Sequence, residues 1–150
     1  MDGRKQEYLN ILNQKLDSLL NMLKATQILQ ITGEGDDDNL VNEAELYSSL
    51  YEQRAEVIKK IEKMDEKLVQ YDDIKDNADL VKARSPIIDK IKAAAKEMAE
   101  LDKKHLESSK KLTKFLRDEL KKIRDGRDIN NAYNFEAYEA LSGSYFDKTN

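Results

Sequence analysis

The stretch YSSLYEQRAEVIKKIEKMDEKLVQY, residues 47–71, decides the fold class. Apolar or aromatic residues recur in it at alternating steps of three and four, which is the spacing of an amphipathic helix with one buried face. The one polar residue on this stripe is Arg54, whose methylene stem can lie along the face while its guanidinium reaches a carboxylate or solvent. We predict a helix over 39–71, with the stripe formed by Tyr47, Leu50, Arg54, Val57, Ile61, Met64, Leu68 and Tyr71.

The segment before it carries a similar stripe and predicts a helix over 4–32. The stretch TGEGDDDN, residues 32–39, ends that helix, because Gly33 can adopt the left-handed conformation and the Asp run offers acceptors to the next helix start. The stripe consists of Leu9, Leu12, Leu16, Leu19 and Leu23, widened by Ile11, Leu20 and Ile28.

A third helix is predicted over 86–125, with Ser85 as its cap and Pro86 at its first position. A short helical piece within 78–83 is compatible with the sequence before it. The stripe of the third helix runs through Ile87 or Ile88, Ile91, Ala94, Met98, Leu101, Leu112, Phe115 or Leu116, Leu120 and Ile123.

Short connections between long helices make neighbours antiparallel. The expected fold is therefore all-α, an elongated antiparallel three-helix bundle or coiled coil over residues 1–126. Gly126 ends the third helix, and a short helix is compatible with residues 128–141 of the C-terminal segment 127–150.

Composition narrows the functional classes. Of 150 residues, 39% are hydrophobic and 37% charged, the net charge is -4, and there is no Cys, which excludes disulfides and thiolate chemistry. No run approaches the roughly 18 apolar residues that span a bilayer, and the N-terminus has no apolar signal region. We expect a cytoplasmic protein with no membrane insertion.

The sequence contains none of the usual catalytic patterns. It has one His and lacks a Gly-rich phosphate loop, a Walker lysine and a zinc-binding H-E-x-x-H helix. His105 lies near the seam of the third helix, where a structural or exposed role is expected. We therefore expect no enzyme, no catalytic or metal-binding residues and no cofactor.

The acidic loop invites a calcium interpretation, which its spacing rejects. An EF-hand loop needs Gly at position six and Glu at position twelve, and counting from Asp36 these positions hold Val41 and Tyr47. A helix-capping loop is the better interpretation.

Residues 103–127 hold ten Lys or Arg against four Asp or Glu. We interpret these basic residues as dispersed around the helix on a solvated face, with an acidic protein as a likelier partner than nucleic acid. Nucleic-acid binding is not expected.

The C-terminal segment holds five of the ten aromatic residues, namely Tyr133, Phe135, Tyr138, Tyr145 and Phe146. Two interpretations stay open: the rings pack back on the bundle, or they form a recognition surface of the kind in which Tyr and Phe are enriched.

Residues 19–68, LLNMLKATQILQITGEGDDDNLVNEAELYSSLYEQRAEVIKKIEKMDEKL, resemble the small flagellar type III export chaperones of the FlgN and FliT type. The resemblance lies in a leucine-rich first helix, a short loop with acidic and Asn residues, and a helix with an Arg before an apolar pair. Leu50, Arg54, Val57, Ile58, Ile61 and Met64 fall on that pattern, and the ending SYFDKTN is similar to that of many relatives.

This resemblance implies a cytosolic, non-catalytic protein that binds the termini of hook-associated or filament-cap subunits. Such a protein prevents their premature assembly and delivers them to the type III export apparatus. Contacts with export apparatus components and a homodimer are further expectations. Clients of this kind present amphipathic helices, which a helical bundle can receive in a groove.

We place the client groove on the end of the third helix and the segment after it. The partner-binding residues expected there are Leu112, Phe115, Leu116, Leu120, Ile123, Tyr133, Phe135 and Tyr138. Two alternatives remain: a coiled-coil adaptor or self-assembling scaffold without a secreted client, and a nucleic-acid-binding regulator.

Overall fold

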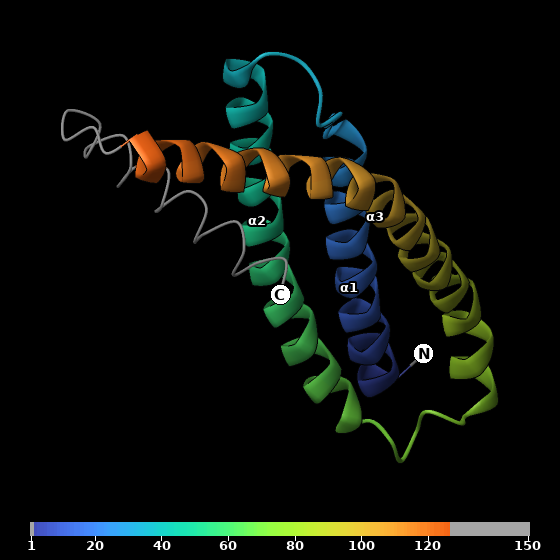
Figure 1. The fold of residues 1–150 in the computed structure, drawn as a ribbon. Helices are drawn as coiled ribbons and strands as arrows, with labels where there is room; N and C mark the ends of the chain where they lie inside the picture. Colours follow the sequence, from blue (N-terminus) through green and yellow to red (C-terminus); the bar gives the residue numbers. More distant parts are fainter. Residues whose placement is uncertain (1, 127–150) are drawn as a thin grey trace. The chain divides into compact units, whose positions relative to one another are not determined.

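The computed structural model of the protein describes residues 2–126, and this part of the chain is all-α. The helices α1 (Gly3–Ile28), α2 (Asp37–Val69) and α3 (Ala78–Gly126) follow one another, and residues 2–126 contain no strand (Figure 1). The predicted three-helix bundle is thus confirmed. The segment 127–150, with the short helix considered at 128–141, lies outside the described residues.

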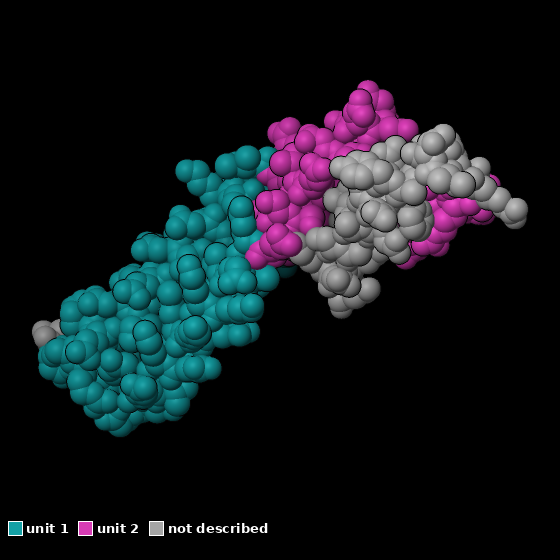
Figure 2. Space-filling model, turned by 90° about the vertical axis from the view of Figure 1, so that its left-hand side faces the viewer, with its two compact units in different colours: residues 1–28, 53–101 teal, residues 29–52, 102–150 magenta. Residues whose placement is uncertain are grey.

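Two compact units share α2 and α3. Unit 1 comprises Met1–Ile28 and Gln53–Leu101, and unit 2 comprises Leu29–Glu52 and Asp102–Asn150 (Figure 2). The connection after α1, residues 29–36, therefore belongs to unit 2, whereas α1 itself belongs to unit 1.

Unit 1 is held by two apolar clusters among its three helices. In one, Tyr8 and Leu9 near the start of α1 meet Leu80 near the start of α3, and Leu68 near the end of α2 packs against them. Within unit 1, α2 therefore runs antiparallel to both neighbours. The second cluster contains Leu19, Met22, Leu23, Ile61, Ala94 and Met98.

The leucine stripe of α1 is buried as predicted, at Leu9, Leu12, Leu16, Leu19 and Leu23. Two residues expected to widen it, Leu20 and Ile28, are exposed instead, Ile28 by 70%. α1 also ends at Ile28, four residues before the predicted end. The residues after it have other contacts, because Ile31 packs into unit 2 and Gly33 has a left-handed φ of 69°.

The stripe of α2 is confirmed. Tyr47, Leu50 and Ile61 are buried, and Arg54, Val57, Met64 and Leu68 are half-buried. α2 ends at Val69, two residues before the predicted end, so the half-buried Tyr71 lies in the turn after the helix. α2 begins two residues before the predicted start, because Asp36 caps it: the Asp36 carboxylate accepts a hydrogen bond from the Asn39 amide at 2.8 Å. Asp37 and Asp38 in the first turn place negative charge at the positive end of the helix dipole, which stabilises the helix.

The predicted start of α3 at Ser85 and Pro86 is wrong. α3 begins at Ala78, and Asn77 caps it by accepting hydrogen bonds from the amides of Asp79 and Leu80 at 3.1 and 3.5 Å. Pro86 lies inside the helix, where it cannot donate to the carbonyl four residues back. The burial of Leu80 among residues of α1 offsets that loss and holds the first turns helical.

Candidate functional site

The client groove predicted from the sequence falls in unit 2, on the pairing of α2 with α3. Leu112 and Leu116 are both 0% exposed and lie in one cluster with Leu40, Ala44 and Tyr47 of α2. We call residues 37–52 and 102–126, which form this pairing, the hairpin. At one end of the hairpin, the hydroxyl of Tyr51 in α2 donates to the carboxylate of Asp102 in α3 at 2.7 Å. Toward the other end, Leu40 of α2 lies in one cluster with Leu116 of α3. The two helices are therefore antiparallel.

The structure brings several predicted partner-binding residues together, and they differ in how deeply they are buried. Leu112 and Leu116 form the interior of the hairpin, and Leu120 is buried as well. Phe115 is half-buried against the same cluster, and Ile123 is half-buried one turn beyond Leu120. Tyr133, Phe135 and Tyr138 lie outside the described residues, so their part in binding stays a prediction.

The connection between α1 and α2 closes one side of this core. We call residues 29–36 the strap. Ile31 of the strap is buried in the cluster with Leu112 and Leu116, and Leu29 packs against it. An apolar side chain of the strap therefore completes the interior that two helices leave open in unit 2.

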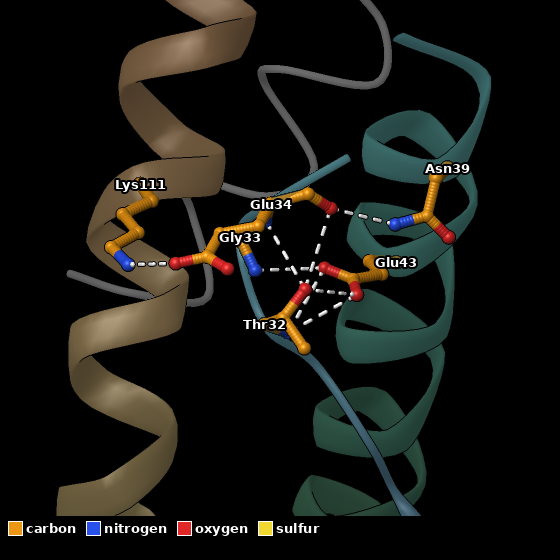
Figure 3. A network of polar contacts seen from close by, with 6 residues as sticks. All are labelled: Thr32, Gly33, Glu34, Asn39, Glu43 and Lys111. Atoms are coloured by element: carbon orange, nitrogen blue, oxygen red, sulfur yellow. Dashed lines mark hydrogen bonds and ion pairs between the residues drawn. The ribbon is translucent and has the colours of Figure 1, made fainter. Parts of the chain in front are cut away.

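A buried carboxylate of α2 holds the strap in place (Figure 3). The Glu43 side chain accepts hydrogen bonds from the backbone amides of Thr32, at 3.1 Å to each oxygen, and of Gly33, at 2.9 Å. The Thr32 hydroxyl also donates to Glu43, at 3.0 Å. Glu43 is only 6% exposed, so these donors replace the water that its charge would otherwise need.

Further contacts fix the tip of the strap. Asn39 donates to the Glu34 carbonyl at 2.8 Å, and Lys111 of α3 forms an ion pair with the Glu34 carboxylate at 3.1 Å (Figure 3). A Cβ added to Gly33 would lie 2.6 Å from the Cβ of Lys111, so only glycine allows this approach of the strap to α3.

The middle of the hairpin is polar as well as apolar. Tyr47 and Tyr51 stack with ring centroids 4.5 Å apart, and the buried His105 and Ser109 fill the gap between Leu101 and Leu112 on the stripe of α3. The Ser109 hydroxyl donates to the Leu106 carbonyl at 2.8 Å, which satisfies it within the helix. His105 thus has the seam position that the sequence led us to expect.

Several side chains near the helix ends have shifted pKa values. In unit 2, the hydrogen bond to Glu119 raises the pKa of Lys122. In unit 1, the Arg4 guanidinium lowers the pKa of Asp73, and the hydrogen bond to Glu7 raises the pKa of the Tyr71 hydroxyl. These shifts have local hydrogen bonds as their first cause and do not mark a catalytic pair.

Within residues 2–126, no group of three or more His, Cys, Asp or Glu is arranged to hold a metal ion. None of the helices described has the length and apolar character needed to cross a bilayer.

Comparisons with protein-family models, with curated proteins and with solved structures found no match for this chain. The resemblance to the export chaperones therefore rests on sequence patterns alone, those of residues 19–68 and of the ending SYFDKTN.

Glu43 is a residue of this region that the sequence did not single out. It stands among acidic residues at the start of α2, which resemble a solvated helix end. Its position nevertheless contains a signal, because Glu43 lies three residues after Leu40 and four before Tyr47, on the buried stripe. A carboxylate on an apolar stripe must find donors, and the strap supplies them.

Proposed function

We propose that the protein is a cytoplasmic flagellar type III export chaperone. In this proposal it binds the amphipathic terminal helices of hook-associated or filament-cap subunits, prevents their premature assembly and delivers them to the export apparatus. The sequence resemblance over residues 19–68 and the all-helical fold support it.

The observation that carries the proposal is the core of the hairpin. Two helices bury Leu112 and Leu116, while Phe115 beside them keeps part of its ring accessible. The third side is closed by the strap, which contributes Ile31 and Leu29. An amphipathic helix could extend this core by laying its apolar face along Phe115 and Ile123.

The expected residues would then act in two ways. Phe115 and Ile123 touch the client, whereas Leu112, Leu116 and Leu120 hold them in position from beneath. Exposed basic side chains around them, such as Lys122, contact client carboxylates and raise the association rate. The aromatic residues of the C-terminal segment complete the surface in this proposal.

Calorimetry with purified hook-associated and filament-cap subunits tests the proposal. We expect Phe115→Ala to weaken binding at least about tenfold, because partly buried aromatic residues are common hot spots of interfaces. Phe115→Leu, which keeps apolar volume, should lose less. Circular dichroism of both variants checks that the hairpin is intact. Absence of binding by the full chain to any such subunit at about 100 μM would exclude this function.

The C-terminal segment is tested separately by truncation after Gly126. The shortened chain should keep most of its helical circular dichroism, because α1, α2 and α3 remain. Client affinity should fall if the aromatic residues take part. Full affinity of the shortened chain would confine the site to the hairpin.

A further inference from the structure

Four lysines of α3 point to one side of unit 2. All four are exposed: Lys103, Lys110, Lys114 and Lys121. Lys103 and Lys121 are 18 residues apart, which is five turns of an α-helix, so they point in the same direction. We call these four residues the lysine row, which extends over about 27 Å. The sequence led us to expect basic residues dispersed around this helix, and these four of them share one side of it.

Two other lysines of the same helix segment form ion pairs elsewhere. Lys111 pairs with Glu34 of the strap, and Lys122 pairs with Glu119. Both lie about a quarter turn from the lysine row. Within residues 2–126, no ion pair of unit 2 involves a member of the lysine row.

The exposed side of α2 in the same unit carries a row of opposite charge. Asp38, Glu45 and Glu52 are exposed and spaced seven residues apart. We call them the acidic row. Asn42 and Ser49 lie between them on the same side and are also exposed, so a neighbouring helix meets only small uncharged side chains between the carboxylates.

The two rows share a spacing of seven residues at one end of each. Lys103 and Lys110 are seven residues apart, as are Asp38 and Glu45, so both pairs are separated by about 10.5 Å along their helices. Charges repeated at seven residues select partners and orientation when helices pair side by side. We propose that the lysine row of one molecule binds the acidic row of a second copy of this chain.

One register satisfies the charges on both helices. With α3 of one copy parallel to α2 of the next, Lys103 faces Asp38 and Lys110 faces Glu45. Glu107, which lies between these lysines, then faces the uncharged Asn42. The contact joins two different surfaces, so in a bound pair one copy still presents Asp38 and Glu45 and the other still presents Lys103 and Lys110, and association continues in the head-to-tail manner.

Nucleic acid fits the lysine row less well than the second copy does. Glu107 and Asp118 flank the row, and a phosphate backbone would bring further negative charge against them. The acidic row offers a matched arrangement of carboxylates on the same unit. The proposal is independent of client binding, which involves the opposite, core-facing side of α3.

Reciprocal charge reversal tests the proposal by sedimentation velocity between about 10 and 500 μM protein, in about 0.01 M and 0.3 M salt. The wild-type protein should associate reversibly at low salt and dissociate at high salt. Lys103→Glu with Lys110→Glu should weaken self-association at least about tenfold, and so should Asp38→Lys with Glu45→Lys, because like charges then face each other. An equimolar mixture of the two variants should associate again, to within about threefold of wild type.

Matched controls change the same charges elsewhere on the same helices. Lys92→Glu with Lys96→Glu and Glu62→Lys with Glu66→Lys alter exposed residues in unit 1 and should associate as the wild type does. Circular dichroism of every variant confirms that the helices are kept.

Three outcomes would overturn the proposal. The wild type could show a constant sedimentation coefficient throughout the low-salt series. The mixed variants could fail to associate although the wild type does, which would place self-association on another surface. A 20-base-pair duplex, used as a probe, could bind the wild type and not the lysine-row variant in the absence of self-association, which would assign the row to nucleic acid.

Discussion

Single residues decide how the connection between α1 and α2 is held, and Glu43 is the foremost of them. Its buried carboxylate receives donors from Thr32 and Gly33, both outside any helix. A buried carboxylate contributes to stability through the hydrogen bonds that it accepts. Replacing it with a side chain that cannot accept them leaves the donors buried without a partner, which is the main cost.

Glu43→Gln should lower the free energy of unfolding by about 1–3 kcal/mol, because an amide nitrogen takes the place of one acceptor and leaves a buried donor unsatisfied. Urea unfolding measures the change. Glu45→Gln, two residues further along on the exposed side, should change it by less than about 0.5 kcal/mol. Equal effects of the two substitutions would mean that the strap is not held by Glu43.

At the scale of the helices, the local sequence pattern predicted most of the residues that the structure buries. The stripe of α2 from Tyr47 to Leu68 is buried or half-buried throughout, because its period is that of the helix itself. The end of α1 and the start of α3 were misplaced, since both depend on contacts distant in sequence. Ile31 is drawn into unit 2, and Leu80 is fixed against α1.

Pro86→Ala should stabilise the protein by about 1–3 kcal/mol, because an interior proline lacks a donor and strains the preceding turn. Thermal or urea unfolding measures this.

Two further substitutions locate the true helix start: Asn77→Ala should cost about 0.5–2 kcal/mol as the loss of a cap, whereas Ser85→Ala should be nearly neutral. The reverse ranking would put the start of α3 at Pro86.

At the scale of the whole molecule, three helices were predictable and the division into two units was not. The stripes of α2 and α3 continue from one unit into the other, so no change of period marks the boundary near Glu52 and Leu101. For the candidate site, Leu112, Phe115 and Leu116 pack together, and their role in binding stays a prediction from the sequence. The sequence could not show that Leu112 and Leu116 are interior, because Ile31 comes from another part of the chain.

Stability of the whole chain should depend on pH through the contact that ties the start of α1 to the connection after α2. Arg4 pairs with Asp73 at 2.6 Å and stacks over the Tyr71 ring, and it lowers the pKa of Asp73 below its ordinary value of 3.8. A lowered pKa means that this contribution is present above 3.8 and is lost as pH falls through the lowered value.

Arg4→Gln should therefore lower the melting temperature at neutral pH, and the difference from wild type should shrink as the solution is acidified below pH 3.8. Thermal unfolding of both proteins over this range measures it. The effect should be small, because both side chains are more than half exposed. A difference that stays constant down to the lowest pH would assign the effect of Arg4 to its contact with Tyr71.

The hold of Glu43 on the strap also limits how this chain can change in length. Connections between helices usually accept insertions and deletions, because their backbone is bound only to water. Here the amides of Thr32 and Gly33 are matched to one side chain, and Ile31 immediately before them is buried. One residue added or removed between Ile31 and Asp36 would separate the donors from Glu43, so a helix side chain sets the length of the loop that precedes it.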